Sequence, residues 1–253
     1  MKLQEVLDKT VRFFKEKNFE SPRLDAELLI AKAMGFRRID LYLKFDQPLK
    51  DEEVGKCREA VRRRSLGEPV AYILGQKEFY GISFEVDSRV LIPRPETELL
   101  AEEALAYLKS RPEATEPLQL MDLGSGSGCL GLTLLSKTSE SRAVLVDLSN
   151  DALEVARKNA EQLGLSGRTH FVNADAAKVS ADVHFDLIIA NPPYIARQDT
   201  RVAADVLKFE PHQALFAEDD GFAMIRLWSE NAVSLLKPGG WIGFEIGMDQ
   251  GSK

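Results

Sequence analysis

The sequence has little of what marks a disulfide-rich, metal-binding or membrane-spanning protein. Its 253 residues include two cysteines, Cys57 and Cys129, and three histidines, and none of these lies at the spacing of a metal site. No apolar run is long enough to cross a bilayer, and the opening residues MKLQEVLDKT lack the apolar core of a leader peptide. We therefore expect a cytoplasmic protein that has no structural disulfide, binds no metal and does not associate with membranes.

Basic charge is scarce in most of the chain. Residues 1–80 contain 17 Lys and Arg against 14 Asp and Glu, whereas residues 81–253 contain 16 against 26. The basic run at 62–64 is too short for the broad positive surface that a nucleic acid requires. The charge pattern thus argues against direct nucleic-acid binding, and it leaves the mildly basic front part able to meet an acidic partner.

The first part of the chain shows a helical period. Apolar residues recur at helical spacing, which predicts helices over 3–14, 22–34 and 51–66. The second of these is expected to be capped by Ser21 and to end at Gly35. Helices this short and amphipathic must pack on one another, so we expect a small helical domain.

Later segments change period and predict a different fold. At 79–86 the period becomes two, which predicts one strand of a hairpin whose partner is the segment 89–93. From residue 118 apolar runs alternate with helical patterns, and this alternation predicts a parallel sheet covered by helices on both faces. The expected domains are a helical domain at 1–76, a β-hairpin linker at 77–94 and an α/β domain at 95–253.

A glycine-rich segment, MDLGSGSGCLG (121–131), follows the first strand expected in the α/β domain. Its glycines allow a sharp turn and a close approach of the backbone to a ligand. The segment fits GxGxxG over 126–131, a dinucleotide fingerprint, and also DLGxGxG, the form found in S-adenosylmethionine (SAM) methyltransferases, where Asp122 is the acid. Asp147 ends the next strand and is placed to accept hydrogen bonds from two ribose hydroxyls, a role that both classes share. An adenosine ligand is therefore expected, and Asp122 favours SAM.

The segment ANPPYI follows the apolar run FDLII (185–189), beyond the carboxyl end of a predicted strand. Each proline fixes its own φ, restricts the residue before it and offers no N–H. The side-chain oxygen of Asn191 and the carbonyl of Pro192 can therefore accept the two N–H groups of a planar NH2, while Tyr194 stacks on its plane. Such a clamp suits methylation of an amide or aromatic amine. From the motif alone, the acceptor is a DNA base, a ribosomal RNA base or a protein glutamine.

Six stretches of the sequence resemble one family, the peptide chain release factor glutamine N5-methyltransferases (PrmC/HemK type). They are GEPVAYILGQKEFYG (67–81), VLIPRPETE (90–98), DLGSGSG (122–128), NPPYI (191–195), EPHQALFAEDDG (210–221) and LLKPGGWIGFEIG (235–247). The resemblance implies a Rossmann-like class I SAM methyltransferase domain, preceded by a small helical domain that docks the release factor and by a β-hairpin linker. It also implies that SAM is the cofactor and that the acceptor is the glutamine amide of the GGQ loop, which acts in translation termination.

The resemblance assigns roles to matching positions. It implies a clamp on the glutamine formed by Asn191, Pro192, Pro193 and Tyr194, of which Asn191, Pro192 and Tyr194 are catalytic. It implies a SAM pocket formed by Gly124, Ser125, Gly126, Ser127, Gly128, Asp147, Asp175 and Asn191. Arg94, Pro95, Glu96 and Thr97 match a PRPETE segment near this pocket. Relatives often contact adenine through an acid followed by an aromatic residue; Asp175 matches the acid, and Ala176 departs from the pattern.

The end of the sequence also departs from the family. Relatives continue past EIG (245–247) with a helix and a terminal pair of strands, whereas this sequence ends in MDQGSK. In the family's sheet those strands cover the edge beside the fifth strand. We therefore expect residues 241–246 to form an exposed apolar edge, with lower stability or self-association as the result.

Three other functions stay open on the sequence. A nucleic-acid amino-methyltransferase would use the same chemistry, although the acidic segment 81–253 would repel phosphates. A nicotinamide-dependent oxidoreductase would use the GxGxxG pattern. A non-catalytic module would bind SAM or a release factor without transferring a methyl group.

Overall fold

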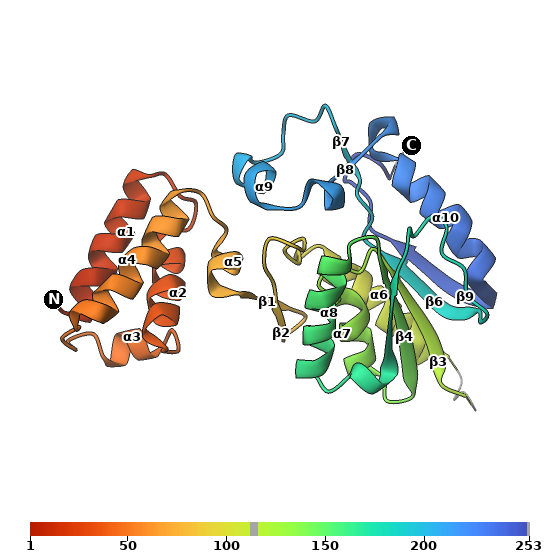
Figure 1. Ribbon diagram of the computed structural model, residues 1–253, viewed down its shortest axis with the longest axis horizontal. Coiled ribbons are helices and arrows are strands. Elements are labelled where there is room, and N and C mark those ends of the chain that lie inside the picture. Colours follow the sequence, from red (N-terminus) through yellow and green to blue (C-terminus); the bar gives the residue numbers. More distant parts are fainter. Residues whose placement is uncertain (112–115, 252–253) are drawn as a thin grey trace. The chain divides into compact units, whose positions relative to one another are not determined.

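The computed structural model describes residues 1–111 and 116–251, which Figure 1 shows as a ribbon. The chain divides into two compact units, Met1–Gly75 and Gln76–Lys253. The first unit is helical, and the second contains a parallel sheet with helices. Across the described ranges, no helix has both the length and the apolar character that crossing a bilayer requires.

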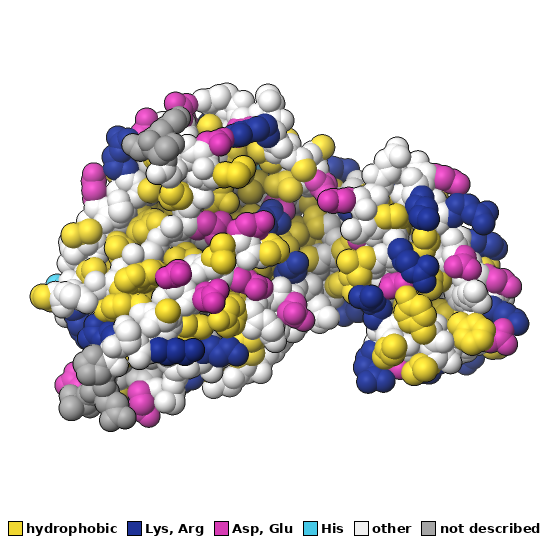
Figure 2. Space-filling model, turned by 180° about the vertical axis from the view of Figure 1, so that it is seen from behind, with side chains coloured by type: hydrophobic (Ala, Val, Ile, Leu, Met, Phe, Trp, Pro, Cys, Tyr) yellow, Lys and Arg dark blue, Asp and Glu magenta, His cyan; other side chains and the backbone are white. Residues whose placement is uncertain are grey.

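Helices enclose a single apolar core in the first unit. The core is filled by side chains that are almost fully buried, among them Leu3, Phe14, Leu29 and Ile30. The helices are α1 (Leu3–Glu16), α2 (Pro22–Met34), α3 (Asp40–Leu43), α4 (Asp51–Ser65) and α5 (Val70–Leu74). The three predicted helices correspond to α1, α2 and α4, whereas α3 and α5 are too short to show a period. Figure 2 shows Lys and Arg side chains spread over the visible face of this unit rather than gathered in one patch.

The ends of α2 agree only in part with the prediction. Gly35 ends the helix with a φ of +67°, a left-handed conformation that glycine adopts without a steric cost. Ser21 occupies the N-cap position, but its hydroxyl caps no backbone amide of the described chain. The helix therefore begins without a side-chain cap. Pro22 occupies the first helical position and has no N–H, so the first turn has one fewer backbone donor that needs a partner.

The hairpin lies earlier in the chain than predicted. Its strands are β1 (Gln76–Phe79) and β2 (Ile82–Glu85), and the segment 89–93 forms no strand. The prediction of one strand over 79–86 was wrong because Tyr80 and Gly81, with φ of +52° and +74°, form the turn. Phe79 and Phe84 are buried against helices of the second unit, so the hairpin is part of that unit's core.

The second unit has the predicted α/β fold. Its five strands are all parallel and lie in the order β5-β4-β3-β6-β9. They are β3 (Leu118–Leu123), β4 (Ser141–Asp147), β5 (Thr169–Asn173), β6 (Phe185–Ala190) and β9 (Leu236–Phe244). The longer helices are α6 (Thr97–Ser110), α7 (Cys129–Lys137), α8 (Asn150–Gln162) and α10 (Ala223–Leu235). Shorter elements are α9 (Ala204–Phe209), β7 (Ile195–Ala196), β8 (Phe216–Ala217) and 3-10 turns at Ser166–Arg168, His212–Ala214 and Asp219–Gly221. Numbered along the chain, the five strands follow the order 3-2-1-4-5 of a doubly wound sheet.

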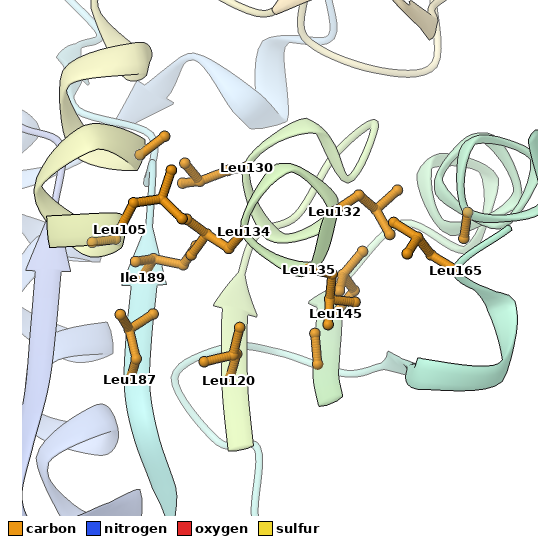
Figure 3. Close-up of a cluster of buried hydrophobic side chains, with 14 of the residues drawn as sticks. Leu105, Leu120, Leu130, Leu132, Leu134, Leu135, Leu145, Leu165, Leu187 and Ile189 are labelled. Carbon is orange, nitrogen blue, oxygen red and sulfur yellow. The ribbon is translucent and has the colours of Figure 1, made fainter. Parts of the chain in front are cut away.

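Both faces of the sheet are covered. Figure 3 shows Leu120, Leu145, Leu187 and Ile189 pointing from their strands toward leucines of α6 and α7. On the opposite face, alternate residues of the same strands pack with α10, among them Met121, Val146 and Ile188. Burial of a leucine or isoleucine contributes about 1.5–3 kcal/mol each, which explains why these strands are apolar throughout rather than alternating.

Register brings the carboxyl ends of four strands into one row. Leu123 of β3 pairs with Val146 of β4 and with Ala190 of β6, and Ala190 pairs with Phe244 of β9. The strand order reverses at β3, because β4 follows on one side and β6 on the other. Ligands of doubly wound sheets bind beyond the carboxyl ends at such a reversal.

The outer strand β9 is the expected sheet edge. Within the described part of the chain it pairs only with β6. Lys237 and Pro238 occupy its first half, and both residue types discourage pairing at an edge, whereas the second half contains Trp241 and Ile242.

We expect this edge to cause self-association. Unpaired backbone groups beside apolar side chains favour pairing with a second strand, so the apparent mass should rise with protein concentration. Light scattering over a concentration series measures this, and a monodisperse monomer at high concentration would contradict it.

Candidate functional site

A cavity of about 450 Å³ lies at the carboxyl ends of the central strands. Most of the predicted cofactor residues line it: Gly124, Ser125, Gly126, Ser127, Asp147, Asp175 and Asn191. Gly128 does not. An added methyl group there would lie 3.0–3.2 Å from Leu132, Leu145 and Ala156, so Gly128 allows close packing at the start of α7. The structure therefore brings together residues at or just beyond the carboxyl ends of four different strands.

The glycine loop reverses direction through left-handed backbone. Gly124, Gly126 and Gly128 have φ of +69°, +54° and +77°, conformations that other residues rarely adopt. Gly124 also has no space for a side chain, because an added Cβ would lie 2.6 Å from the ring of Trp228. The loop thus presents bare backbone to the cavity, which is the surface that a polar ligand group requires.

Asp147 holds the glycine loop to the end of β4. Its carboxylate accepts hydrogen bonds from the amides of Gly126 (2.8 Å) and Ser149 (2.9 Å). Burial raises the pKa of Asp147, and the hydrogen bonds from Ser149 and Gly126 act in the opposite direction. Each carboxylate oxygen has a second lone pair, so the group can still accept hydrogen bonds from ligand hydroxyls. The Ser149 hydroxyl in turn caps α8 by accepting from the amide of Ala152.

Asp122 lies deeper, beneath the loop. Its side chain is almost fully buried and accepts a hydrogen bond from the amide of Gly131 at 2.9 Å. Burial raises the pKa of Asp122 to about 7, and the neighbouring charge of Asp147 adds to the effect. Although Asp122 contributes to the cavity lining, its bond to Gly131 mainly ties β3 to the first turn of α7.

The part of the cavity next to β5 has an aromatic wall from an unexpected source. Asp175 accepts a hydrogen bond from the amide of Ala177 at 2.9 Å, and the buried Ala176 lies beside it. Trp228 of α10 lines the same cavity and packs in one cluster with Ala176. Its indole nitrogen is buried without a hydrogen-bond partner among the described residues, as is the hydroxyl of Ser125. Trp228 thus contributes an aromatic side chain to the cavity lining, in the same cluster as Ala176.

Asn191 separates two cavities. It lines the large cavity, and it also lines a second one of about 290 Å³, together with Pro192 and Tyr194. The Nδ2 group of Asn191 donates to Thr97 Oγ1 at 3.1 Å, which leaves Oδ1 to accept from a substrate. Among the described residues, the carbonyl of Pro192 accepts no hydrogen bond. Both acceptors expected from the sequence are therefore available, and Pro193 lines the large cavity.

A carboxylate that sequence analysis did not single out lies behind this motif. Glu245 accepts hydrogen bonds from the hydroxyls of Thr97 (2.6 Å) and Tyr194 (3.1 Å). Burial raises the pKa of Glu245, while hydrogen bonds from Thr97, Tyr194 and Asn191 act in the opposite direction. Burial, followed by the charge of Glu245, raises the pKa of Tyr194 to about 12, so the phenol stays protonated at neutral pH and donates.

A second carboxylate fixes the segment that matches PRPETE. Glu210 is almost fully buried and accepts hydrogen bonds from Arg94 Nη2 at 2.6 Å and from the amide of Ile92 at 3.1 Å. Arg94 lines both cavities. His212 also lines the large cavity, and its Nε2 lies 2.6 Å from the carbonyl oxygen of Leu207.

Comparisons with known proteins find matches to both units of the chain. The chain matches a PrmC N-terminal domain over residues 5–75 and a methyltransferase small domain over residues 102–217. It is 43% identical over 251 residues to the release factor glutamine methyltransferase of Chlorobaculum tepidum, an alignment that covers 97% of this chain and 85% of that protein. The corresponding proteins of Rhodopirellula baltica and Geobacter sulfurreducens are 40% and 39% identical, with 95% and 98% of this chain and 82% and 85% of theirs aligned.

We expect Gly124→Ala to weaken SAM binding about tenfold or more. The new methyl group would meet Trp228 at 2.6 Å, and either the ring or the loop must move into the cavity. Isothermal titration of SAM measures the loss. Gly35→Ala is the matched control, because its φ of +67° gives similar backbone strain with no atom within 4 Å. Unchanged affinity in Gly124→Ala would contradict the expectation.

Proposed function

This chain belongs to the release factor glutamine methyltransferase family, and we propose that it transfers a methyl group from SAM to a glutamine side-chain amide of a peptide chain release factor. The observation that carries the proposal is the position of Asn191 and its neighbours between two cavities. The cavity of about 450 Å³ has room for a nucleotide-type cofactor, and the cavity of about 290 Å³ has room for a single amino-acid side chain.

The residues of the large cavity fit SAM. The bare backbone of the glycine loop suits the methionine part of SAM, and Asp147 can accept from the ribose hydroxyls. The unpartnered Ser125 hydroxyl and Trp228 indole N–H are buried polar groups that a ligand would satisfy. Asp175 lies at the adenine side. SAM, when bound, supplies an electrophilic methyl group on a sulfonium centre.

Asn191 and Pro192 orient the acceptor nitrogen. An amide nitrogen is a poor nucleophile because its lone pair is delocalised into the carbonyl group. Oδ1 of Asn191 and the carbonyl of Pro192 would each accept one N–H, which holds the lone pair toward the methyl group and stabilises the positive charge that develops on nitrogen. Tyr194 would form a wall of the side-chain cavity. The nitrogen can lose its proton after methyl transfer, so the reaction requires no general base beforehand.

The partner and the cellular setting follow from this reaction. We infer that the acceptor is the glutamine of the release factor GGQ loop and that the enzyme acts in the cytoplasm during translation termination. The helical unit, with its small excess of basic residues, is the docking domain in this proposal. The acidic composition of residues 81–253 disfavours DNA or ribosomal RNA as the acceptor.

A methyl-transfer assay with labelled SAM tests the proposal. The acceptors are a purified release factor, its glutamine-to-alanine loop variant, duplex DNA and ribosomal RNA. Label should appear on the release factor and disappear with the glutamine. Label on a nucleic acid, or on no acceptor, would overturn the assignment.

Two substitutions should separate chemistry from cofactor binding. Asn191→Ala should abolish transfer and leave SAM affinity within about twofold, because it removes an acceptor used by the substrate nitrogen. Asp147→Ala should weaken SAM binding, since it loses the ribose contacts and frees the glycine loop. Titration calorimetry and the transfer assay together measure both effects. Equal loss of SAM binding in Asn191→Ala would assign that residue to the cofactor pocket instead.

A further inference from the structure

We propose that Glu245, Thr97 and Gln250 form a positioning bracket that sets the orientation of Asn191 and Tyr194 for methyl transfer. The bracket lies behind the Asn191–Tyr194 motif, and its members come from the start of α6 and from the segment after β9. This inference rests on the proposed function, and it concerns how the motif is held rather than what it binds.

Backbone geometry places Glu245 beside the motif. Ala190, the last residue of β6, pairs with Phe244, the last residue of β9, and the amide of Glu245 donates to the carbonyl of Ala190 at 2.9 Å. Because Glu245 and Asn191 both follow these paired residues, they leave the sheet together. The backbone hydrogen bonds between β6 and β9 thus position the Glu245 carboxylate.

The direction of each hydrogen bond determines which way the Asn191 amide points. An ionised carboxylate can only accept, so the hydroxyl of Thr97 must donate to Glu245. The Thr97 oxygen then has only lone pairs to offer Asn191, and it accepts from Nδ2. The amide oxygen Oδ1 is consequently turned away from Thr97. The charge on Glu245, acting on the Asn191 Nδ2 group directly and through Thr97, selects the amide orientation that a substrate N–H requires.

Tyr194 is held at both ends. Its phenol donates to Glu245 Oε1 at 3.1 Å, and its carbonyl accepts from Gln250 Nε2 at 3.2 Å. Gln250 is oriented by the amide of Gly247, which donates to its Oε1 at 2.8 Å. Gly221 packs closely against the Tyr194 carbonyl, because an added Cβ at Gly221 would lie 2.1 Å from that oxygen. The ring that walls the second cavity therefore cannot turn without breaking contacts to the bracket.

Glu245→Gln tests the directional argument without a change of shape. Glutamine can donate as well as accept, so the Thr97 hydroxyl can reverse and the Asn191 amide can flip. We expect kcat for methyl transfer to fall by about tenfold to a hundredfold, with SAM affinity and KM for the release factor within about twofold of wild type. Glu161→Gln, an exposed change on α8, is the matched control and should behave as wild type.

Thr97 provides a second and independent comparison. Thr97→Val removes the hydroxyl and should lower kcat as Glu245→Gln does, whereas Thr97→Ser keeps the hydroxyl and should retain most of the activity. The inference is overturned if Glu245→Gln keeps the wild-type kcat, if Thr97→Ser is as impaired as Thr97→Val, or if SAM affinity falls in parallel with kcat.

A readout that needs no substrate distinguishes this inference from the proposed function. The side-chain amide protons of Asn191, assigned by their loss in Asn191→Ala, should exchange slowly with solvent in the wild type and faster in Glu245→Gln and Thr97→Val. If the wild-type protein methylates no release factor, the proposed function fails, and these exchange rates still decide whether the bracket exists. Equal exchange in all three proteins would reject it.

Discussion

The shared register of four parallel strands is the constraint on which the site depends. Val146, Leu123, Ala190 and Phe244 lie in one row across the sheet. The residue that follows each of them lies at or just beyond the same edge of the sheet, which assembles Asp147, Gly124, Asn191 and Glu245. A slip of one residue in any strand would turn its side chains to the opposite face and remove one member of this set. The buried apolar faces that fix the register therefore also fix the chemistry.

Structural features that depend on a single segment of the chain could be predicted from the sequence. The parallel α/β fold, the helices of the first unit and the position of the glycine loop follow from periodicity and glycine spacing. The hairpin was misplaced because Tyr80 at a positive φ looks like a strand residue in the sequence. The sequence could not predict the contacts of Thr97, Trp228 and Glu245. Each of these residues reaches the site because of strand register or because of packing with segments far away in the chain. Ala176 departed from the family's pattern, but the sequence did not indicate that Trp228 would line the same cavity.

Asn191 lines both cavities, and so do Leu91, Arg94 and Ala214. A residue shared by a cofactor cavity and an acceptor cavity has to keep one orientation toward both, so rigidity of the motif matters. Two prolines stiffen the motif, and it donates hydrogen bonds to Thr97 of α6 and to Glu245 after β9.

Trp228 has a consequence beyond binding. Its ring lies against Gly124, and its buried N–H has no partner among the described residues, so its surroundings change when a ligand enters the large cavity. The only other tryptophan in the sequence, Trp241, stacks on Tyr107 and is not among the residues that line that cavity. Of the two tryptophans, Trp228 is thus the one at the cofactor cavity, so a change in intrinsic fluorescence on SAM binding is expected to arise from Trp228.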